Sequence, residues 1–116
     1  MIEIEPERQT RHLLAALLHQ LESELRLQAL WQRDPPSEAA LQSREPFAID
    51  TLNFVQWLQF IFLPKMINLL RYSLPLPTTI CVAPMANEYF KALPLDSRQI
   101  EDIISRIDHL LSEPHE

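Results

Sequence analysis

Glycine is absent from this sequence of 116 residues. Glycines let the backbone approach phosphate groups closely, so their absence excludes the Gly-rich loops of P-loop and dinucleotide-binding folds. It also excludes the Gly-containing nucleophile elbow of hydrolases and the Gly-containing signatures of common RNA-binding modules. Several large classes of enzyme and RNA-binding protein are therefore ruled out before any motif is considered.

Cysteine and valine are scarce. Cys81 is the one cysteine, so the chain forms no internal disulfide and offers no thiolate cluster for zinc. Only 2 valines accompany 20 leucines and 10 isoleucines, and a leucine-rich chain without glycine favours helix over sheet. We expect an all-α protein in a reducing compartment.

Long uninterrupted apolar runs are also missing. The longest apolar stretch, residues 54–70, contains Gln56, Gln59, Lys65 and Asn68, which makes it too polar for a membrane-spanning helix. The first residues are acidic and polar, unlike the basic and then apolar start of a secretory signal peptide. We therefore expect a cytoplasmic location and no membrane association.

Acidic side chains outnumber basic ones by 16 to 10, which gives a formal net charge of −6. Phosphate backbones are bound mainly by lysine and arginine. Basic residues cluster only at Arg8 and Arg11, next to His12, and a short run of this kind is usually a solvated helix face. We expect no DNA binding, and tRNA binding that is weak or indirect.

The apolar pattern predicts a single helical domain over residues 1–116. Four stretches carry apolar residues at helical spacing, and proline-containing connectors separate them. Such a chain is expected to fold as a small, irregular four-helix bundle. The predicted helices span residues 6–31, 50–72, 83–93 and 96–112.

Residues near the helix ends support these boundaries. Asp50 or Thr51 is the expected N-cap of the helix 50–72. Pro84 suits the first turn of the helix that follows. Asp96 and Gln99 have the spacing of a capping box at the start of the last helix.

The helix 50–72 is apolar on nearly all sides, which is typical of a helix that is central in a bundle or covered by a partner. Pro64 is expected to kink it, because proline lacks an N–H and its ring clashes with the carbonyl of Phe60. Trp57 is expected to be a core anchor, although tryptophan is also common at interfaces.

The polar residues form no recognisable catalytic or metal site. Asp50 is a potential nucleophile, but it stands where a helix cap is expected. His12 and His19 lack the Glu-x-x-His pairs of a di-iron bundle. Cys81 has no base near it in the sequence. We therefore expect no catalytic residue, no metal and no cofactor.

A set of short motifs is distributed between Trp31 and Pro84. They are Trp31, Pro46-Phe47, Asp50-Thr51, Trp57-Leu58-Gln59, Leu63-Pro64 with Met66, Leu69-Leu70, Leu76-Pro77 and Ala83-Pro84. In these motifs the chain resembles the YqcC-like family of small bacterial proteins. The resemblance implies a small helical bundle, and members of that family are often labelled as tRNA pseudouridine synthases.

The resemblance does not carry over a catalytic residue. A pseudouridine synthase of this kind has a large mixed α/β catalytic domain with an aspartate nucleophile. This chain has no strand pattern, and Asp50 stands in no matching motif. We interpret the label as the activity of a partner, a tRNA pseudouridine synthase that this chain assists.

The main hypothesis is therefore a non-catalytic accessory protein that binds this synthase through the helix 50–72 and the loops that flank it. The alternatives are a helical module that binds RNA directly and a small enzyme with an unrecognised site. The candidate partner-binding residues are Phe47, Gln56, Phe60, Leu63, Ile67 and Arg71. The residues expected to anchor the fold are Trp31, Asp50, Trp57, Leu58, Pro64 and Pro84.

Overall fold

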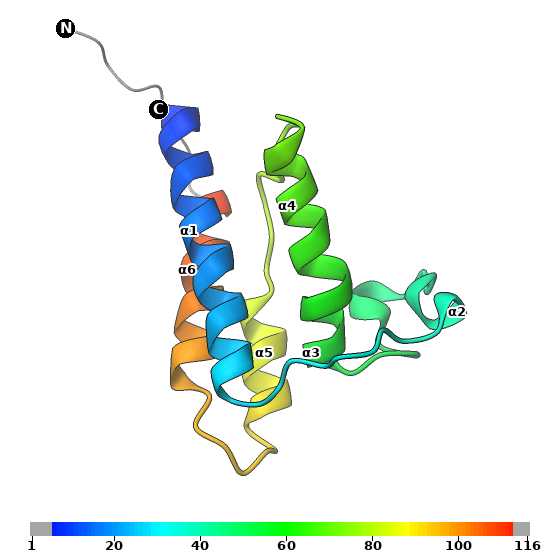
Figure 1. The fold of residues 1–116 in the computed structure, drawn as a ribbon. Helices are drawn as coiled ribbons and strands as arrows, with labels where there is room; N and C mark the ends of the chain where they lie inside the picture. Colours follow the sequence, from blue (N-terminus) through cyan, green and yellow to red (C-terminus); the bar gives the residue numbers. More distant parts are fainter. Residues whose placement is uncertain (1–5, 113–116) are drawn as a thin grey trace, which may run out of the picture.

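The computed structural model describes residues 6–112, and the regular structure in this range is helical throughout (Figure 1). The predicted all-α class is confirmed, while the domain limits at residues 1 and 116 lie outside the described range. The elements are α1 (Pro6–Leu27), α2 (Glu38–Leu41), the short helix η1 (Pro46–Ala48), α3 (Phe54–Trp57), the π-helical segment η2 (Leu58–Phe62), α4 (Leu63–Arg71), α5 (Ala83–Phe90) and α6 (Arg98–Ser112).

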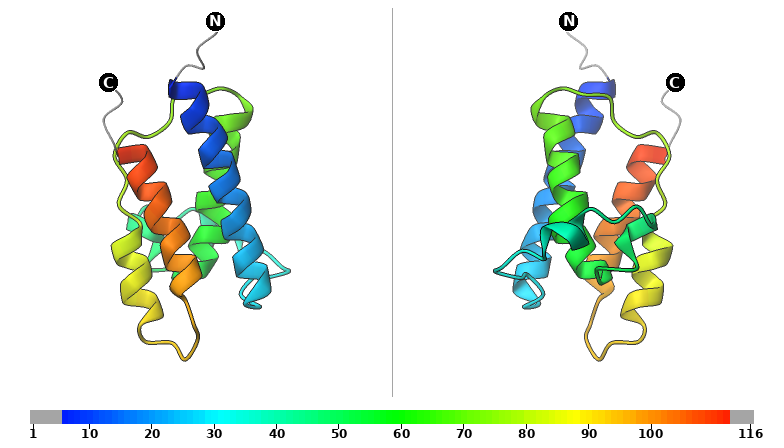
Figure 2. Two further views of the ribbon diagram at one scale, coloured as in Figure 1. Left: turned by 90° about the vertical axis from the view of Figure 1, so that its left-hand side faces the viewer. Right: turned by 90° about the vertical axis from the view of Figure 1, so that its right-hand side faces the viewer.

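The bundle has α1 and α6 packed along each other, with α4 against α1 and α5 against α6 (Figures 1 and 2). α3, η2 and α4 follow one another without a break and form one long helix, residues 54–71. Apolar residues at helical spacing fill the core between these elements. The fully or nearly fully buried core residues include Leu14, Leu18, Leu21 and Leu25 of α1, Leu58, Phe62 and Met66 of the long helix, and Ile100, Ile104 and Ile107 of α6.

α1 ends at Leu27, four residues before the predicted end at Trp31. Ala29 adopts a left-handed backbone conformation, with φ 59°. The Leu30 N–H donates to the Leu25 carbonyl at 2.8 Å, and the Ala29 N–H donates to the Arg26 carbonyl at 3.1 Å. These two bonds form a Schellman motif, which usually has glycine at the left-handed position. The motif was missed because alanine stands there.

The long helix ends in the same way. Ser73 has φ 53°, the Leu74 N–H donates to the Leu69 carbonyl at 2.9 Å, and the Ser73 N–H donates to the Leu70 carbonyl at 3.3 Å. Phe47 and Ala48 also have positive φ values, 57° and 48°. Within the described residues, four non-glycine residues thus lie in a backbone region that glycine normally occupies.

The long helix begins at Phe54, four residues later than predicted. Asn53 is its N-cap, and its side chain accepts from the Gln56 N–H at 2.8 Å while the Gln56 side chain accepts from the Asn53 N–H at 2.9 Å. The predicted caps are wrong because both residues bond within the connector. The exposed Asp50 carboxylate accepts from the Ser43 hydroxyl, and the Thr51 hydroxyl donates to the Ala40 carbonyl at 2.7 Å.

The irregularity expected at Pro64 takes the form of a π-helical segment. Leu58–Phe62 ends two residues before the proline, and the Leu63 N–H donates five residues back to the Leu58 carbonyl. Single π-helical turns within α-helices are a known way to absorb a local disruption. Pro64 itself is exposed in the first turn of α4.

α5 begins at Ala83 as predicted, with the exposed Pro84 in its first turn, but it ends at Phe90 instead of residue 93. Asp108 of α6 fixes the start of α5: its Oδ2 atom accepts from the backbone N–H groups of Val82 and Ala83 at 2.8 and 2.7 Å. This cap comes from a distant part of the chain and has no local sequence signal.

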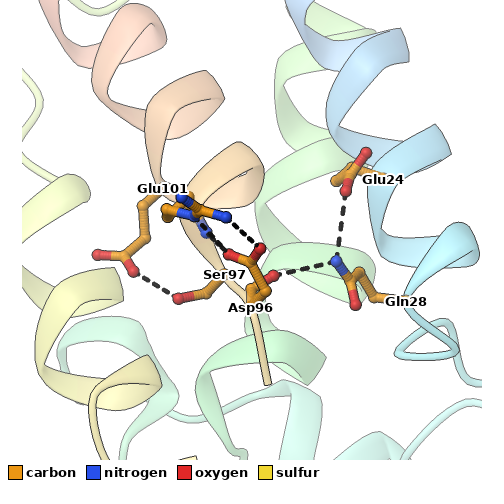
Figure 3. Close-up of polar contacts among 6 residues, drawn as sticks. Glu24, Gln28, Asp96, Ser97 and Glu101 are labelled. Atoms are coloured by element: carbon orange, nitrogen blue, oxygen red, sulfur yellow. Dashed lines mark hydrogen bonds and ion pairs between the residues drawn. The ribbon is translucent and has the colours of Figure 1, made fainter. Parts of the chain in front are cut away.

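α6 begins at Arg98, and the predicted Asp96–Gln99 capping box is wrong. Ser97 precedes the helix, and its carbonyl accepts the Glu101 N–H at 2.9 Å. Asp96 instead binds Arg98, whose side-chain and backbone hydrogen bonds lower the pKa of the Asp96 carboxyl to about 2. The Asp96 carbonyl accepts from Gln28 at 3.0 Å and so joins the end of α1 to the start of α6 (Figure 3).

Candidate interaction surface

The six candidate partner-binding residues do not all lie on one surface. Leu63 is only 2% exposed and belongs to the core, so its assignment to a partner surface is wrong. In an isolated helix, Leu63 lies opposite the main apolar face and would be open to a partner. In the bundle, α1 packs against α4 and Leu63 is buried. Gln56 is half-buried and donates to the Gln32 side chain at 3.1 Å, in addition to capping the helix.

Three of the candidates lie together on the outer side of the long helix. Phe60 is half-buried, Ile67 is 39% exposed, and Arg71 is exposed in the last turn. We call Phe60, Ile67 and Arg71 the outer face of the long helix. Ile67 and Arg71 also line a shallow groove between α4 and α1, together with His19 and Glu22. An apolar centre with charged residues at its edge is the composition of many protein interfaces.

Phe47 lies on a different surface. Its ring packs on Trp57 with 4.7 Å between the ring centroids, and Trp57 is itself 6.0 Å from Phe54. This aromatic cluster holds the connector against the start of the long helix. Beside it lies a second shallow hollow, which Phe47 and Phe54 line together with Met85 and Tyr89 of α5.

The expected anchors differ in burial. Leu58 is fully buried, whereas Trp57 and Trp31 are half-buried. The Arg26 guanidinium lies 4.4 Å from the centre of the Trp31 ring, a cation–π geometry. Asp50 is exposed, so it contributes to the fold through the hydrogen bond that it accepts from Ser43 and not through packing.

Gln59 is an anchor that the sequence reasoning missed. It is 6% exposed, accepts from the Gln32 N–H at 2.8 Å, and donates to the Gln32 carbonyl at 2.6 Å. A buried amide with both bonds satisfied fixes the connector on the π-helical segment. The available signals were an amide among the apolar residues of the helix and its place in the Trp57-Leu58-Gln59 motif.

Arg11 has a role beyond the solvated helix face that its sequence context suggests. Its side chain is 20% exposed and donates to the backbone carbonyls of Leu69 at 3.3 Å and Leu74 at 2.5 Å, besides pairing with Glu7. Arginine therefore satisfies carbonyls at the end of α4, where the helix dipole favours a positive charge. No local pattern links residue 11 to residues 69 and 74.

The charged side chains form local pairs. Among the residues that the structure describes, five of the ten basic residues pair with acidic residues close to them in sequence: Arg11, Arg26, Lys91, Arg98 and Arg106. Within residues 6–112, no three His, Cys, Asp or Glu side chains are grouped so that they could hold a metal ion. In the same range, every helix is too short or too polar to cross a membrane.

Comparisons with known proteins identify the family and several relatives of this chain. Residues 13–110 match a family described as tRNA pseudouridine synthase C. The chain belongs to this family. It is 40% identical over 74 residues to an uncharacterised protein of Haemophilus influenzae, covering 64% of this chain and 70% of that protein. It is 36% identical over 93 residues to the uncharacterised protein YqcC of Escherichia coli, covering 80% of this chain and 83% of that protein.

A solved structure agrees with these similarities. The solution NMR structure of protein YqcC from E. coli aligns with a TM-score of 0.78 and 29% identity, over 92% of this chain and 96% of that one. The YqcC-like resemblance expected from the sequence motifs is thereby confirmed, together with the helical fold.

A third relative is a much longer protein. The chain is 47% identical over 60 residues to a protein of Pectobacterium carotovorum named tRNA pseudouridine synthase C. The match covers 52% of this chain but only 16% of that protein. More than four fifths of the longer protein therefore lies outside the part that resembles this chain.

Proposed function

We propose that this protein is a non-catalytic, cytoplasmic accessory factor that binds a tRNA pseudouridine synthase and assists tRNA modification. The observation that carries the proposal is the limited match to the tRNA pseudouridine synthase C of P. carotovorum, where the similar region is a small part of a much longer chain. Covalent linkage keeps two domains at a high effective concentration. A separate chain of the same family lacks this linkage and would have to bind the synthase non-covalently to stay beside it.

The side chains described above favour an accessory role over catalysis. The hollows beside the long helix are shallow and lined mainly by apolar groups, whereas an active site needs convergent polar groups in a protected pocket. Asp50 is exposed and accepts a hydrogen bond from the Ser43 hydroxyl, whereas an aspartate nucleophile acts from within a protected pocket. The family description then refers to the activity of the longer proteins.

Charge favours a protein partner over free tRNA. The formal net charge is −6, and half of the basic side chains are already paired with acidic neighbours. Affinity for a phosphate backbone depends on basic groups that release counterions. The factor would therefore meet tRNA mainly through the synthase.

The outer face of the long helix supplies a candidate contact with that partner. Ile67 is 39% exposed although it is large and apolar, and Arg71 lies one turn further along. Substituting Phe60→Ser together with Ile67→Ser should leave the chain folded and weaken binding to the synthase. Leu13→Ser with Leu17→Ser is the matched control, because it also changes one exposed and one half-buried residue, on α1.

The direct test mixes the purified chain with the tRNA pseudouridine synthase C of the same organism and measures binding by calorimetry. We expect a stable complex, weakened by the Phe60/Ile67 variant and not by the Leu13/Leu17 control. A wild-type chain that does not bind the synthase would refute the accessory role. Pseudouridine formed by this chain alone would establish an enzyme, and a tight, salt-dependent complex with free tRNA would establish an RNA-binding module.

A further inference from the structure

The first and last described helices meet at one end of the bundle. α1 starts and α6 finishes there, and the chain after α4 crosses the same end between them (Figure 2). We call residues 72–80 the crossover segment. Its last residue, Ile80, exchanges two hydrogen bonds with the Ser112 hydroxyl in the last turn of α6, at 3.3 and 3.1 Å.

The crossover segment exposes large apolar side chains. Tyr72 is 64% exposed and Leu74 is 45% exposed. The same segment lines a hollow through Leu76 and Pro77, together with Glu7 and Thr10 of α1 and Leu111 of α6. Arg71, the last residue of α4, is exposed and directly precedes Tyr72 in the chain. Aromatic anchors beside a hollow, with an arginine close by, are frequent features of the energetic centre of an interface.

The segment is also held in one conformation. Pro75 and Pro77 restrict the backbone and keep the preceding residues extended. Arg11 fixes one side of the segment by donating to the Leu74 carbonyl, and Ser112 fixes the other at Ile80. A surface that is ordered before binding loses less conformational entropy when a partner docks.

We propose that the crossover segment is the docking surface for the catalytic part of the tRNA pseudouridine synthase. This inference rests on the proposed function and adds to it the surface through which the two proteins bind. The region of the P. carotovorum protein that resembles this chain belongs to a much longer polypeptide, and a catalytic part attached to a domain of this fold would continue from the beginning of α1 or from the end of α6. Both points lie beside the crossover segment, so either connection brings the catalytic part to this end of the bundle.

The other strongly exposed apolar residues lie elsewhere and provide a control. Leu27 is 79% exposed at the opposite end of α1, and Ile49 is 64% exposed in the connector before the long helix. The experiment compares Tyr72→Ser with Leu74→Ser against Leu27→Ser with Ile49→Ser, in the full chain. Calorimetry with the separate synthase C chain gives the affinity, and circular dichroism with thermal melting verifies folding.

We expect the Tyr72/Leu74 variant to bind the synthase at least about tenfold more weakly, because truncating an anchor at an interface centre has an effect of this order. The Leu27/Ile49 control should bind within about twofold of the wild type. Equal binding by a folded Tyr72/Leu74 variant would overturn the assignment of the surface and leave the accessory role standing. Failure of the wild-type chain to bind would overturn both.

A second measurement covers the case in which the Tyr72/Leu74 variant does not fold. A photoreactive benzoylphenylalanine in place of Tyr72 preserves an aromatic side chain at this position. It should cross-link to the synthase on irradiation, whereas the same group in place of Leu27 should not. Cross-linking from residue 27 and not from residue 72 would overturn the proposal.

Discussion

Replacing Ala29 with glycine should stabilise the protein, although glycine inside a helix is destabilising. Ala29 is exposed and has φ 59°, so it holds a left-handed conformation without making core contacts that the substitution would remove. This conformation costs a non-glycine residue about 1–2 kcal/mol. Glycine adds about 0.5–1 kcal/mol of backbone entropy cost relative to alanine. The net expected gain in the free energy of unfolding is about 0.5–1 kcal/mol.

The same substitution inside α1 gives a matched control of opposite sign. Ala16 is exposed in the middle of α1, where Ala→Gly should cost about 1 kcal/mol. The two variants should therefore differ by about 1.5–2 kcal/mol in urea denaturation followed by circular dichroism. For a chain of this size the difference corresponds to a Tm separation of roughly 5–10 °C. A destabilised Ala29→Gly variant would refute the assignment of a Schellman motif to this position.

Three further predictions concern the core, the crossover segment and RNA. Trp57→Ala should lower the free energy of unfolding by about 2–4 kcal/mol, because the half-buried ring packs on Phe47 and Phe54. Urea denaturation measures this change, and an unchanged stability would make Trp57 a surface residue. Arg11→Met should cost about 1–2 kcal/mol by losing bonds to two carbonyls, whereas Arg8→Met on the exposed side should change stability little in the same assay. The purified chain should bind free tRNA only weakly in filter-binding assays at physiological salt, and nanomolar binding would contradict the charge argument.

Sequence periodicity was sufficient to predict the helical class and the core faces of α1 and α6. Leucines at helical spacing in α1 and isoleucines in α6 lie where the pattern places them. The exception in α1 is Leu13, which is 52% exposed at the edge of the stripe. Periodicity works here because each of these helices presents a single apolar face to the others.

The helix ends were harder to predict because their determinants are weak or distant. Ala29 and Ser73 form left-handed caps without glycine, so the usual marker is missing. Asp108 caps α5 from the last helix, and Arg11 satisfies carbonyls near residue 70 from the first. Such contacts exist only once the tertiary fold brings distant residues together.

The candidate surface was predicted only in part for a similar reason. An isolated helix 50–72 has apolar residues all round, and nothing local indicates which of them the bundle covers. Packing of α1 takes Leu63 into the core and leaves Ile67 partly exposed. The crossover segment was predicted only as a loop flanking the helix 50–72, because its place in the bundle depends on where α1 begins and α6 ends in space.

The most direct test of the accessory role is the pseudouridine content of the tRNAs that synthase C modifies, measured by mass spectrometry in cells lacking this chain. We predict a lower content than in wild-type cells, restored by the wild-type chain and by the Leu27/Ile49 control but not by the Tyr72/Leu74 variant. Unchanged pseudouridine in cells that lack the chain but retain the synthase would contradict the account.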